Sequence, residues 1–568
     1  MRHTGPLLLL AASAAAIQVP FFDRWLSGSK LEITDASQTS RIAIIGAGAG
    51  GSSAAFWIAK AKERYGLDVA IDIYDRNSHI GGRSTTVQPY DDLSYEPVEL
   101  GASVFVEINK NLWKATNEFN LSRINFEEGS GETGFWDGED FVFRLGTVGG
   151  TIGSWYDSLK VIWRYGYTAP TKAQRLVKQM TDKFVGLYAP STPSWTNITA
   201  LTEELGWTEL VAQTGGEYFQ SNGVSKKFTY ELIEAATLVN YAQDMDSIHA
   251  LEAACSVAAA GASSVKGGNW QIFDAFVKHS GANVFLDTIV SSIARKSPTH
   301  WTVRSNKGTL DYRAVILAAP YHSSDISLPS DLAPLVPAQP YVRLHVTLLA
   351  TTAPAPNPVY FGLAEGAKAP TAVLTTLEGM RAGGRAPEFN SLTYHGKLRR
   401  RASTEAEPEP EPEAHVSAEK VVEGEEGKQD AEAVPVEAEK EVKEEEAPEK
   451  DEWVVKIFSM APVSDEWLAN MFLGQVGWVL RQEWDSYPVL PPTTTFPPIK
   501  LDRGLFYVNA FEPFISTMET ETLASRNIVD WLLREEFDAA ICPAKPADAE
   551  PQPQPKGAAK DFVYGWDC

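Results

Sequence analysis

A glycine-rich turn between an apolar run and a helical pattern constrains the fold of this chain more than any other stretch. The run 42–45 (IAII) is predicted to form a buried parallel strand, and Gly46, Gly48 and Gly51 follow it in the pattern G-x-G-x-x-G. Small residues from Ser52 then open a predicted helix. In a dinucleotide-binding βαβ unit, such glycines allow a tight turn, the approach of a pyrophosphate and close packing of the helix. The stretch therefore predicts a dinucleotide site.

An acid ends the next predicted strand. Residues 69–74 are predicted to form that strand, and Asp75 directly after it is placed to accept hydrogen bonds from ribose hydroxyls. The preceding helix N-terminus would offer free N–H groups and a positive dipole end to the phosphates. The alternative is a plain βαβ unit with a glycine turn, in which Asp75 is only a solvated strand-end acid.

A second pair of glycines distinguishes the nucleotide. Gly81, Gly82 and Arg83 close a loop just after Asp75, where the glycines let the backbone lie along a diphosphate and the arginine can offset its charge. This arrangement resembles flavoprotein oxidases, in which a G-G-R segment follows the ribose-binding acid. NAD-only domains generally lack that segment. The resemblance implies FAD as the cofactor.

A run of small residues is predicted to bring the chain back to this nucleotide. Gly101, Ala102 and Ser103 are small enough for a close approach to an isoalloxazine ring. An ordinary strand-to-helix turn explains the same three residues almost as well.

Two further elements extend the resemblance to flavoproteins. Residues 284–293 are predicted to form a strand pair, and residues 312–320 another buried strand that ends in a proline. They resemble the second nucleotide-contacting region of FAD-dependent amine oxidases. That resemblance places the backbone of Val290 against the adenine.

Near the C-terminus the sequence predicts a last strand and helix, over residues 504–510 and 520–534. N–H groups at a helix start stabilise the negative charge that develops at the pyrimidine end of a reduced flavin. Thr517, Met518 and Glu519 match the position in flavin oxidases where backbone amides meet that end.

Length and charge limit the classes of function. At 568 residues the chain can hold two large domains, and its net charge of −24 argues against nucleic acid as a partner. Half of that charge falls in residues 401–450, where 18 acids and 6 bases give −12. Because this stretch has no aromatic residue and no periodic apolar face, it is predicted to be a disordered surface insertion.

A predicted helical insertion rich in bulky side chains lies between the halves of the dinucleotide fold. Residues 155–188 crowd Trp, Tyr, Leu and Ile together, and helical patterning continues through 230–260. Such an insertion usually forms the substrate cavity, so we expect an apolar substrate or peripheral contact with a membrane surface. Burial of most of these aromatics in the core is the alternative.

The first residues predict targeting to the secretory pathway. Residues 1–16 have the weak basic start, apolar centre and Ala-x-Ala cleavage signal of a signal peptide, with an uncleaved amphipathic start as the alternative. The apolar run is too short to span a bilayer, and no later segment reaches roughly 18 clean apolar residues. A vacuole, a lysosome or the extracellular space is the expected destination, and Asn120 and Asn197 are candidate glycosylation acceptors.

The three cysteines do not form a disulfide scaffold. Cys255, in an Ala-rich helical stretch, is predicted to be a buried small hydrophobe that stays reduced. Cys542 and Cys568 flank a Pro-rich tail, and in a secretory protein we expect them to pair and to hold the aromatic end 562–566 on the body. Two free thiols on a frayed tail are the alternative. No Cys/His cluster has metal-ligand spacing, so no metal site is expected.

Taken in order, these motifs make the chain similar to the prenylcysteine oxidase (farnesylcysteine lyase) family. The resemblance covers about residues 41–400 and 452–535. Beyond the glycine motifs, it is carried by ELGAS at 99–103, WRYG at 163–166, NYAQ at 240–243, KGGN at 266–269 and LFYVNA at 505–510.

The resemblance implies oxidation of the thioether in S-farnesyl- or S-geranylgeranyl-cysteine, which is left when prenylated proteins are degraded. A hydride leaves the prenyl carbon next to sulfur for flavin N5, and water adds to the resulting thiocarbenium. A prenyl aldehyde and cysteine are released, and oxygen takes the electrons as hydrogen peroxide. Because the flavin performs the redox step, the protein mainly orients the substrate, and no catalytic acid or base is named. Prenylcysteine and oxygen are the expected partners, with no obligate protein partner.

Two other functions stay open. A flavin amine or polyamine oxidase shares every cofactor motif, and a non-catalytic protein can keep FAD as structure while it binds isoprenoids. In each case the expected fold is α/β, a Rossmann-type FAD-binding domain with an interleaved mixed α+β substrate domain, as in amine oxidases. The FAD-binding domain is assigned to residues 41–110, 265–325 and 500–537, the substrate domain to 111–264, 326–400 and 452–499, the acidic insertion to 401–451, and the tail to 538–568.

Overall fold

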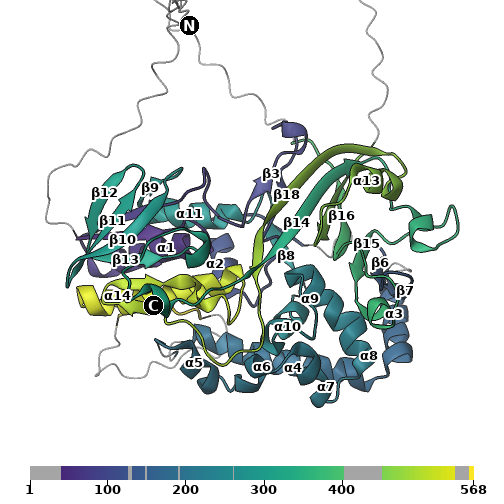
Figure 1. Ribbon diagram of the computed structural model, residues 1–568, viewed down its shortest axis with the longest axis horizontal. Coiled ribbons are helices and arrows are strands. Elements are labelled where there is room, and N and C mark those ends of the chain that lie inside the picture. The colour runs from purple at the N-terminus through teal and green to yellow at the C-terminus, as the bar shows by residue number, and fades with distance from the viewer. Residues whose placement is uncertain are drawn as a thin grey trace, which may run out of the picture.

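The computed structural model describes residues 40–125, 131–146, 150–189, 192, 194–259, 261–401, 451–543 and 562–568. The predicted signal peptide lies outside these residues, as do all but the two end residues of the predicted acidic insertion and most of the Pro-rich tail. The described chain forms two large sheets with helices packed around them (Figure 1).

The first large sheet has six strands in the order β19-β20-β13-β1-β2-β9, and only β19 runs antiparallel to its neighbour. Its strands are β1 (Ser40–Ile45), β2 (Val69–Tyr74), β9 (Asn283–Phe285), β13 (Ala314–Leu317), β19 (Lys500–Asp502) and β20 (Leu505–Tyr507). Helix α1 (Ala49–Tyr65) packs on this sheet and contacts α11 (Trp270–Ser280) and α14 (Met518–Phe537). Ile42, Ile44 and Ile73 are fully buried, as in parallel sheets covered by helices.

The predicted βαβ unit is confirmed, with small shifts at its ends. Helix α1 begins at Ala49 rather than Ser52, because the glycine run itself forms the first helical turn. The strand predicted for 504–510 is too long: β20 ends at Tyr507, and a 3-10 turn, Val508–Phe511, follows it.

A three-stranded antiparallel sheet lies between β9 and β13 in the sequence. It consists of β10 (Val290–Ser297), β11 (His300–Ser305) and β12 (Gly308–Tyr312). The strand pair predicted for 284–293 corresponds to β9 and β10, which belong to different sheets and do not pair with each other. Asp287 between them has a left-handed backbone, with φ of 50°, and turns the chain from one sheet to the other.

The second large sheet has seven strands in the order β18-β14-β17-β16-β15-β6-β7, of which only β15 and β6 run parallel. The strands are β6 (Thr133–Trp136), β7 (Phe141–Leu145), β14 (Tyr341–Thr351), β15 (Ala372–Thr375), β16 (Ser391–Lys397), β17 (Trp453–Ser459) and β18 (Val476–Pro488). Strands β16 and β17 are antiparallel neighbours, so residues 402–450 join two adjacent strand ends.

The predicted helical insertion is confirmed, and most of its helices lie below the seven-stranded sheet in Figure 1, with α5 below α14. They are α3 (Gly150–Tyr165), α4 (Thr168–Val185), α5 (Ile198–Glu204), α6 (Thr208–Ala212), α7 (Gly215–Ser221), α8 (Lys226–Phe228), α9 (Glu234–Tyr241) and α10 (Ala250–Val257). Further helices are α2 (Lys110–Glu118), α12 (Glu378–Arg381), α13 (Asp465–Met471) and a π-helical turn, Thr229–Ile233, between α8 and α9. Two-stranded pairs are formed by β3 (Thr86–Val87) with β4 (Val98–Glu99) and by β5 (Arg123–Asn125) with β8 (Ser263–Val265).

The C-terminal end is fastened to α1. Cys542 and Cys568 form the predicted disulfide, and Cys255 is free. The indole ring of Trp566 packs against the rings of Phe56 and Trp57, with centroids 4.8 and 5.6 Å apart. The prediction that this aromatic end docks on the body is confirmed.

Candidate active site

A cavity of 960 Å³ is lined by residues of both large sheets. All but one of the residues predicted to bind the cofactor line it: Gly46, Gly48, Asp75, Gly81, Gly82, Arg83, Gly101, Ala102, Ser103, Val290, Thr517, Met518 and Glu519. We name the part formed by residues 46–50, 81–83 and 517–519 the nucleotide wall. The part formed by the cavity-lining residues of β14, β16, β17 and β18 is the sheet wall.

The glycine turn needs two of its glycines for different reasons. A Cβ atom on Gly51, the predicted residue that does not line the cavity, would lie 1.8 Å from the carbonyl oxygen of Gly46. Only glycine therefore lets α1 approach the turn. A Cβ atom on Gly48 would meet nothing closer than the Cα atom of Gly82, at 3.8 Å. The protein's own packing thus requires glycine at position 51, whereas the space beside Gly48 is left open for a ligand.

The Asp75 carboxylate is buried behind this turn, with 8% of the residue exposed. Its two oxygens accept backbone N–H groups of Ala47 at 2.7 Å and Asn77 at 2.8 Å, so the solvated alternative is wrong. Each carboxylate oxygen keeps a second lone pair, which leaves capacity for a ribose hydroxyl. Thr288 donates its backbone N–H to the carbonyl of Asp75 at 2.8 Å, which brings the segment of Val290 to the same end of the cavity.

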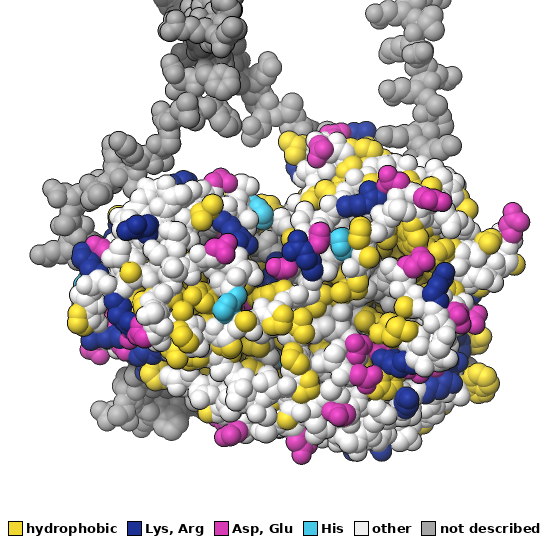
Figure 2. Space-filling model, in the orientation of Figure 1, with side chains coloured by type: hydrophobic (Ala, Val, Ile, Leu, Met, Phe, Trp, Pro, Cys, Tyr) yellow, Lys and Arg dark blue, Asp and Glu magenta, His cyan; other side chains and the backbone are white. Residues whose placement is uncertain are grey.

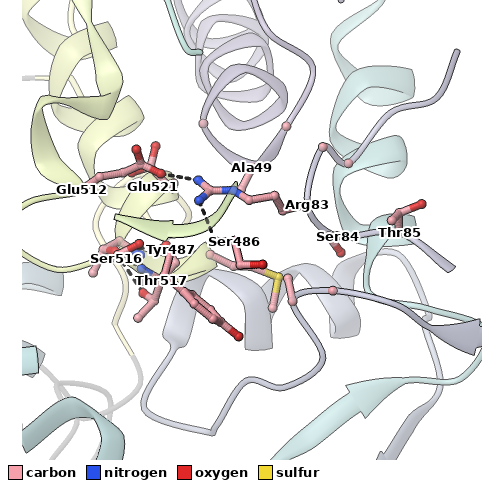
Figure 3. A pocket seen from close by; sticks show the side chains of 18 of the residues that line it. Ala49, Arg83, Ser84, Thr85, Ser486, Tyr487, Glu512, Ser516, Thr517 and Glu521 are labelled. Atoms are coloured by element: carbon pink, nitrogen blue, oxygen red, sulfur yellow. Dashed lines mark hydrogen bonds and ion pairs between the residues drawn. The ribbon is translucent and has the colours of Figure 1, made fainter. Parts of the chain in front are cut away.

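Arg83 is paired with an acid of the protein itself. Its guanidinium forms an ion pair with Glu512, whose side chain is 1% exposed, and donates to the carbonyl oxygen of Ser486 at 3.0 Å. Figure 3 shows Arg83 reaching between these two groups. The charge that the sequence assigns to a diphosphate is therefore already shared with Glu512.

A second acid in the same place, Glu521, is not marked by any sequence pattern (Figure 3). It is 8% exposed, one carboxyl oxygen has no hydrogen-bond partner, and the other lies 3.0 Å from where a Cβ of Gly50 would be. Burial, and then the nearby Glu512, raise the pKa of Glu521 well above its usual range. A protonated carboxyl can donate a hydrogen bond to an anion held at the start of α1.

The start of α14 offers its backbone to the cavity. The helix begins at Met518, slightly before the predicted start at 520, and the hydroxyl of Thr517 caps it by accepting the N–H of Thr520 at 3.0 Å. The side chain of Glu519 serves the fold: its carboxylate accepts the N–H groups of Asn111 and Leu112, both at 3.0 Å, and so caps α2. Residues 517–519 can therefore contact a flavin through their backbone N–H groups, because the side chains of Thr517 and Glu519 cap helices.

Residues 101–103 join the two walls. A Cβ on Gly101 would lie 2.1 Å from the carbonyl oxygen of Arg83 and 2.7 Å from the ring of Trp484 on β18. Asn269, in the predicted KGGN segment, donates its side-chain amide to the carbonyl of Ala102 at 2.8 Å. The hydroxyl of Ser103 donates to the carbonyl of Gly101 at 2.7 Å. Residues 101–103 are thus fixed by close packing and hydrogen bonds on both sides, which an ordinary strand-to-helix turn does not require.

The sheet wall carries a buried lysine that the sequence reasoning missed. Lys456 on β17 is 4% exposed, and its Nζ atom donates to the hydroxyl of Ser103 at 2.7 Å and to the carbonyl of Glu99 at 3.1 Å. Burial lowers the pKa of Lys456 and raises that of the Glu99 carboxyl, each to about 8, while the two charges oppose these shifts. The signal in the sequence is a single charge inside the apolar strand WVVKIFS.

The helical insertion closes the cavity on its apolar side. Met180 and Phe184 of α4, Val239 and Tyr241 of α9, and Cys255 of α10 line it. Cys255 is therefore only partly buried, which corrects the prediction of a buried small hydrophobe.

These residues fit a flavin dinucleotide. Two helix N-termini, those of α1 and α14, lie at the cavity, and the space beside Gly48 is not used by the protein. Glu521 keeps an unpartnered buried oxygen next to the start of α1.

Among the residues that the structure describes, no group of three His, Cys, Asp or Glu side chains can hold a metal ion. Of the described helices, none is long and apolar enough to cross a membrane.

Comparison with known families and relatives agrees with this geometry. A family model described as prenylcysteine lyase matches residues 150–541, and one described as an NAD(P)-binding Rossmann-like domain matches residues 44–119. The chain is 27% identical to farnesylcysteine lyase of Arabidopsis thaliana over 518 residues, which cover 88% of this chain and 90% of that one. It is also 27% identical to prenylcysteine oxidase 1 of Mus musculus over 531 residues, with coverage of 88% and 90%.

Solved structures share the fold at low identity. Putrescine oxidase bound to putrescine superposes with a TM-score of 0.51 at 15% identity, covering 87% of this chain and 99% of that one. A fatty acid isomerase from P. acnes that produces CLA gives 0.52 at 12% identity, with coverage of 89% and 100%. The predicted fold class, a Rossmann-type domain with an interleaved mixed domain, is confirmed.

Proposed function

This chain belongs to the prenylcysteine lyase family, and we propose that it is an FAD-dependent oxidase that cleaves S-prenyl-L-cysteine. Its products are a prenyl aldehyde, cysteine and hydrogen peroxide, with oxygen as the electron acceptor. The observation that carries the proposal is the family match over residues 150–541, the part of the chain that contains the sheet wall and the helices around it. Cleaving a lipidated amino acid needs a cofactor site and an amphiphilic substrate site side by side, and one cavity reaches both walls.

FAD, when bound, supplies the two-electron oxidation of the prenyl carbon next to sulfur and passes the electrons to oxygen. The chain's own residues hold and orient it. We assign the diphosphate to the backbone of the glycine turn, the ribose to Asp75 and the adenine side to Val290. Residues 101–103 would hold the ring, and the backbone of 517–519 would bind its pyrimidine end.

The domain division proposed from the sequence accompanies this assignment. Residues 41–110, 265–325 and 500–537 supply the six-stranded sheet and its helices, and the other segments supply the sheet wall and the helical insertion. Helix α2, just beyond the boundary at 110, contacts both α11 and α14, which supports counting it with the FAD-binding domain.

Anaerobic titration of the purified yellow protein with S-farnesylcysteine tests the function. We expect the visible flavin absorbance to bleach and to return on admission of air, with hydrogen peroxide and a trapped prenyl aldehyde in equal amounts. A flavin that putrescine or benzylamine bleaches, and that farnesylcysteine does not, would identify an amine oxidase instead. A flavin that no substrate bleaches would identify the non-catalytic isoprenoid-binding alternative.

We also propose that the protein docks on an anionic membrane surface through α3. Tyr156, Leu159, Ile162 and Trp163 fall within about a third of the helix circumference, and all four are exposed. Trp163 is 89% exposed, and Tyr167 just after the helix is 70% exposed. Core burial, the alternative interpretation, is therefore wrong for these side chains. Exposed aromatic stripes of this kind are typical of helices that lie in a membrane interface.

Local charge supports an anionic surface as the occupant. Residues 156–178 contain five basic residues and one acidic residue, and of the bases Arg164 and Lys178 are paired with Glu231 and Asp182 outside this stretch. Figure 2 shows hydrophobic side chains beside Lys and Arg side chains at the right-hand edge, over α3. Helix α4 follows directly and lines the cavity through Met180 and Phe184. A prenyl substrate partitions into bilayers, so docking there brings the cavity close to its source.

Co-flotation with phosphatidylcholine vesicles, with and without phosphatidylserine, tests the docking surface. Changing Leu159 and Trp163 together to Glu should reduce binding to anionic vesicles about 10-fold or more, and leave turnover of detergent-dispersed substrate unchanged. Leu93→Glu is the matched control, since Leu93 is 70% exposed on another part of the surface. Equal binding of the double variant and the control would contradict the proposal.

A secretory route to a vacuole or lysosome completes the proposed function. Asn120 and Asn197 are exposed, and Asn197 uses its side-chain oxygen to cap α5, which leaves its nitrogen for a glycan. Endoglycosidase digestion of protein from a eukaryotic host should lower its apparent mass in one step for each sequon, and Asn→Gln changes should remove the steps one by one.

A further inference from the structure

The sheet wall is divided into a polar and an apolar part. Because side chains alternate along a strand, β16 presents Ser391, Thr393 and His395 to the cavity, and β17 presents Lys456 and Phe458. Thr393 lies directly opposite Lys456 in the register of these two strands. On the other side of β17, the neighbouring strand β14 lines the cavity with Leu344 and Val346 and, at its start, with Tyr341.

Lys456 is a buried cation whose hydrogen bonds do not go to a carboxylate. Its two hydrogen bonds go to neutral oxygens, the Ser103 hydroxyl and the Glu99 carbonyl. The Glu99 carboxyl acts on Lys456 electrostatically, but among the described residues no ion pair to the Lys456 Nζ atom is formed, and one Glu99 carboxyl oxygen is buried with no hydrogen-bond partner. A buried ammonium is costly unless it is paired, so this position gains from an anionic ligand.

Helices that border the cavity give it apolar surface that suits a long apolar group. This surface includes Val239 and Tyr241 of α9, Met180 and Phe184 of α4, and Leu112 of α2. A ligand that uses both parts carries an anion at one end and an extended hydrocarbon at the other. An amino acid with a prenyl chain on its sulfur has this form, with its carboxylate a few bonds from the sulfur.

We propose that Lys456 binds the α-carboxylate of the substrate's cysteine and so positions the prenyl carbon next to sulfur beside residues 101–103. The inference rests on the proposed function and adds the residue that selects a free amino acid over its ester. It makes Lys456 a positioning and specificity residue. The hydrogen bond from Nζ to Ser103 ties this carboxylate site to the segment assigned to the flavin ring.

Steady-state kinetics with two substrates test the proposal on the FAD-loaded protein. S-farnesylcysteine carries the carboxylate, and its methyl ester lacks the charge. We expect the wild type to prefer the free acid, and Lys456→Met to lower kcat/KM for the acid about 10- to 100-fold, mostly through KM. The same change should alter kcat/KM for the ester by less than about threefold, with flavin content and spectrum unchanged. Lys456→Arg should restore part of the loss. Lys296→Met, an exposed lysine outside the cavity, is the control.

The outcomes separate this inference from the proposed function. Equal losses on acid and ester, or loss of flavin from Lys456→Met, would place Lys456 at the cofactor and overturn the proposal. Equal KM values for acid and ester in the wild type would also overturn it, and that measurement needs no variant. A wild type that turns over neither substrate would instead overturn the proposed function.

Discussion

The nucleotide wall and the sheet wall border the same cavity, but the first is made mainly of backbone groups and the second mainly of side chains. The nucleotide wall offers backbone: a glycine turn, a second glycine pair and two helix N-termini. The sheet wall offers side chains that alternate along four strands, with Lys456 and Asp485 among them as charged members. Backbone sites depend on glycine at fixed positions, because any side chain there fills the space of the ligand. Side-chain sites can change residue by residue while the strands stay in place.

This difference teaches where each kind of specificity is encoded. A wall of backbone N–H groups recognises a phosphate in any protein that keeps the turn, so it fixes the cofactor. A wall of side chains can be exchanged without loss of the fold, so it sets the substrate.

The largest effect is expected from a substitution in the glycine turn of the nucleotide wall. Gly48→Val places a branched side chain where the protein makes no contact closer than 3.8 Å, so the protein should fold but retain no FAD. Gly51→Ala, by contrast, puts a Cβ 1.8 Å from the Gly46 carbonyl and should damage the fold itself. Flavin absorbance of the purified proteins and their thermal unfolding distinguish the two. A Gly48→Val protein that stays fully yellow would end the assignment.

A smaller effect is expected at the acid behind the turn. Asp75→Ala removes the partner of two backbone N–H groups and the acceptor proposed for the ribose. We expect FAD affinity to fall by about 2–3 kcal/mol, roughly 30- to 150-fold. The FAD affinity of Asp75→Asn should lie between those of the wild type and Asp75→Ala, because the asparagine keeps one of the two side-chain oxygens. Titration of apoprotein with FAD measures both, and an unchanged affinity would leave Asp75 with a structural role only.

Glu519 connects the nucleotide wall to α2 and should make stability depend on pH. Burial raises the pKa of its carboxyl from 4.5 to about 7, so the folded protein holds the proton more tightly than the unfolded chain. Stability is then greatest at low pH and falls as the pH rises from about 4.5 to 7. Glu519→Gln should flatten this fall by about 1–2 kcal/mol. Thermal unfolding from pH 5 to pH 8 measures the change, with the exposed Glu466→Gln as control, and equal slopes in both variants would refute it.

The smallest effect is expected away from both walls. Residues 402–450 join β16 to β17, whose ends already meet: the N–H of Leu398 donates to the carbonyl of Glu452 at 2.7 Å. Replacing 402–450 by a short Gly/Ser linker should leave solubility, flavin content and turnover within about twofold, because loop length changes closure entropy only slowly. Insoluble protein after the deletion would show that the segment contributes to the fold.

The sequence by itself determined the fold class and named residues that the fold brings to one cavity. Strand, glycine turn and helix follow one another over residues 42–65, so the backbone conformation that receives a diphosphate is dictated locally. The same holds for Gly81 and Gly82, and for the helix that starts at Met518. These signals are short-range, since each depends on neighbours within a turn or a strand.

The tertiary structure alone decided which side chains complete the site. Lys456 meets Ser103 from 353 residues away, and Arg83 meets Glu512 across 429 residues. Glu519 turned out to cap a helix 408 residues earlier in the chain. No local pattern encodes such contacts, because they arise when two sheets pack around one cavity and the strands settle into register. The sequence therefore indicated a flavin, and the packing of the sheet wall placed a cation where a substrate carboxylate can bind.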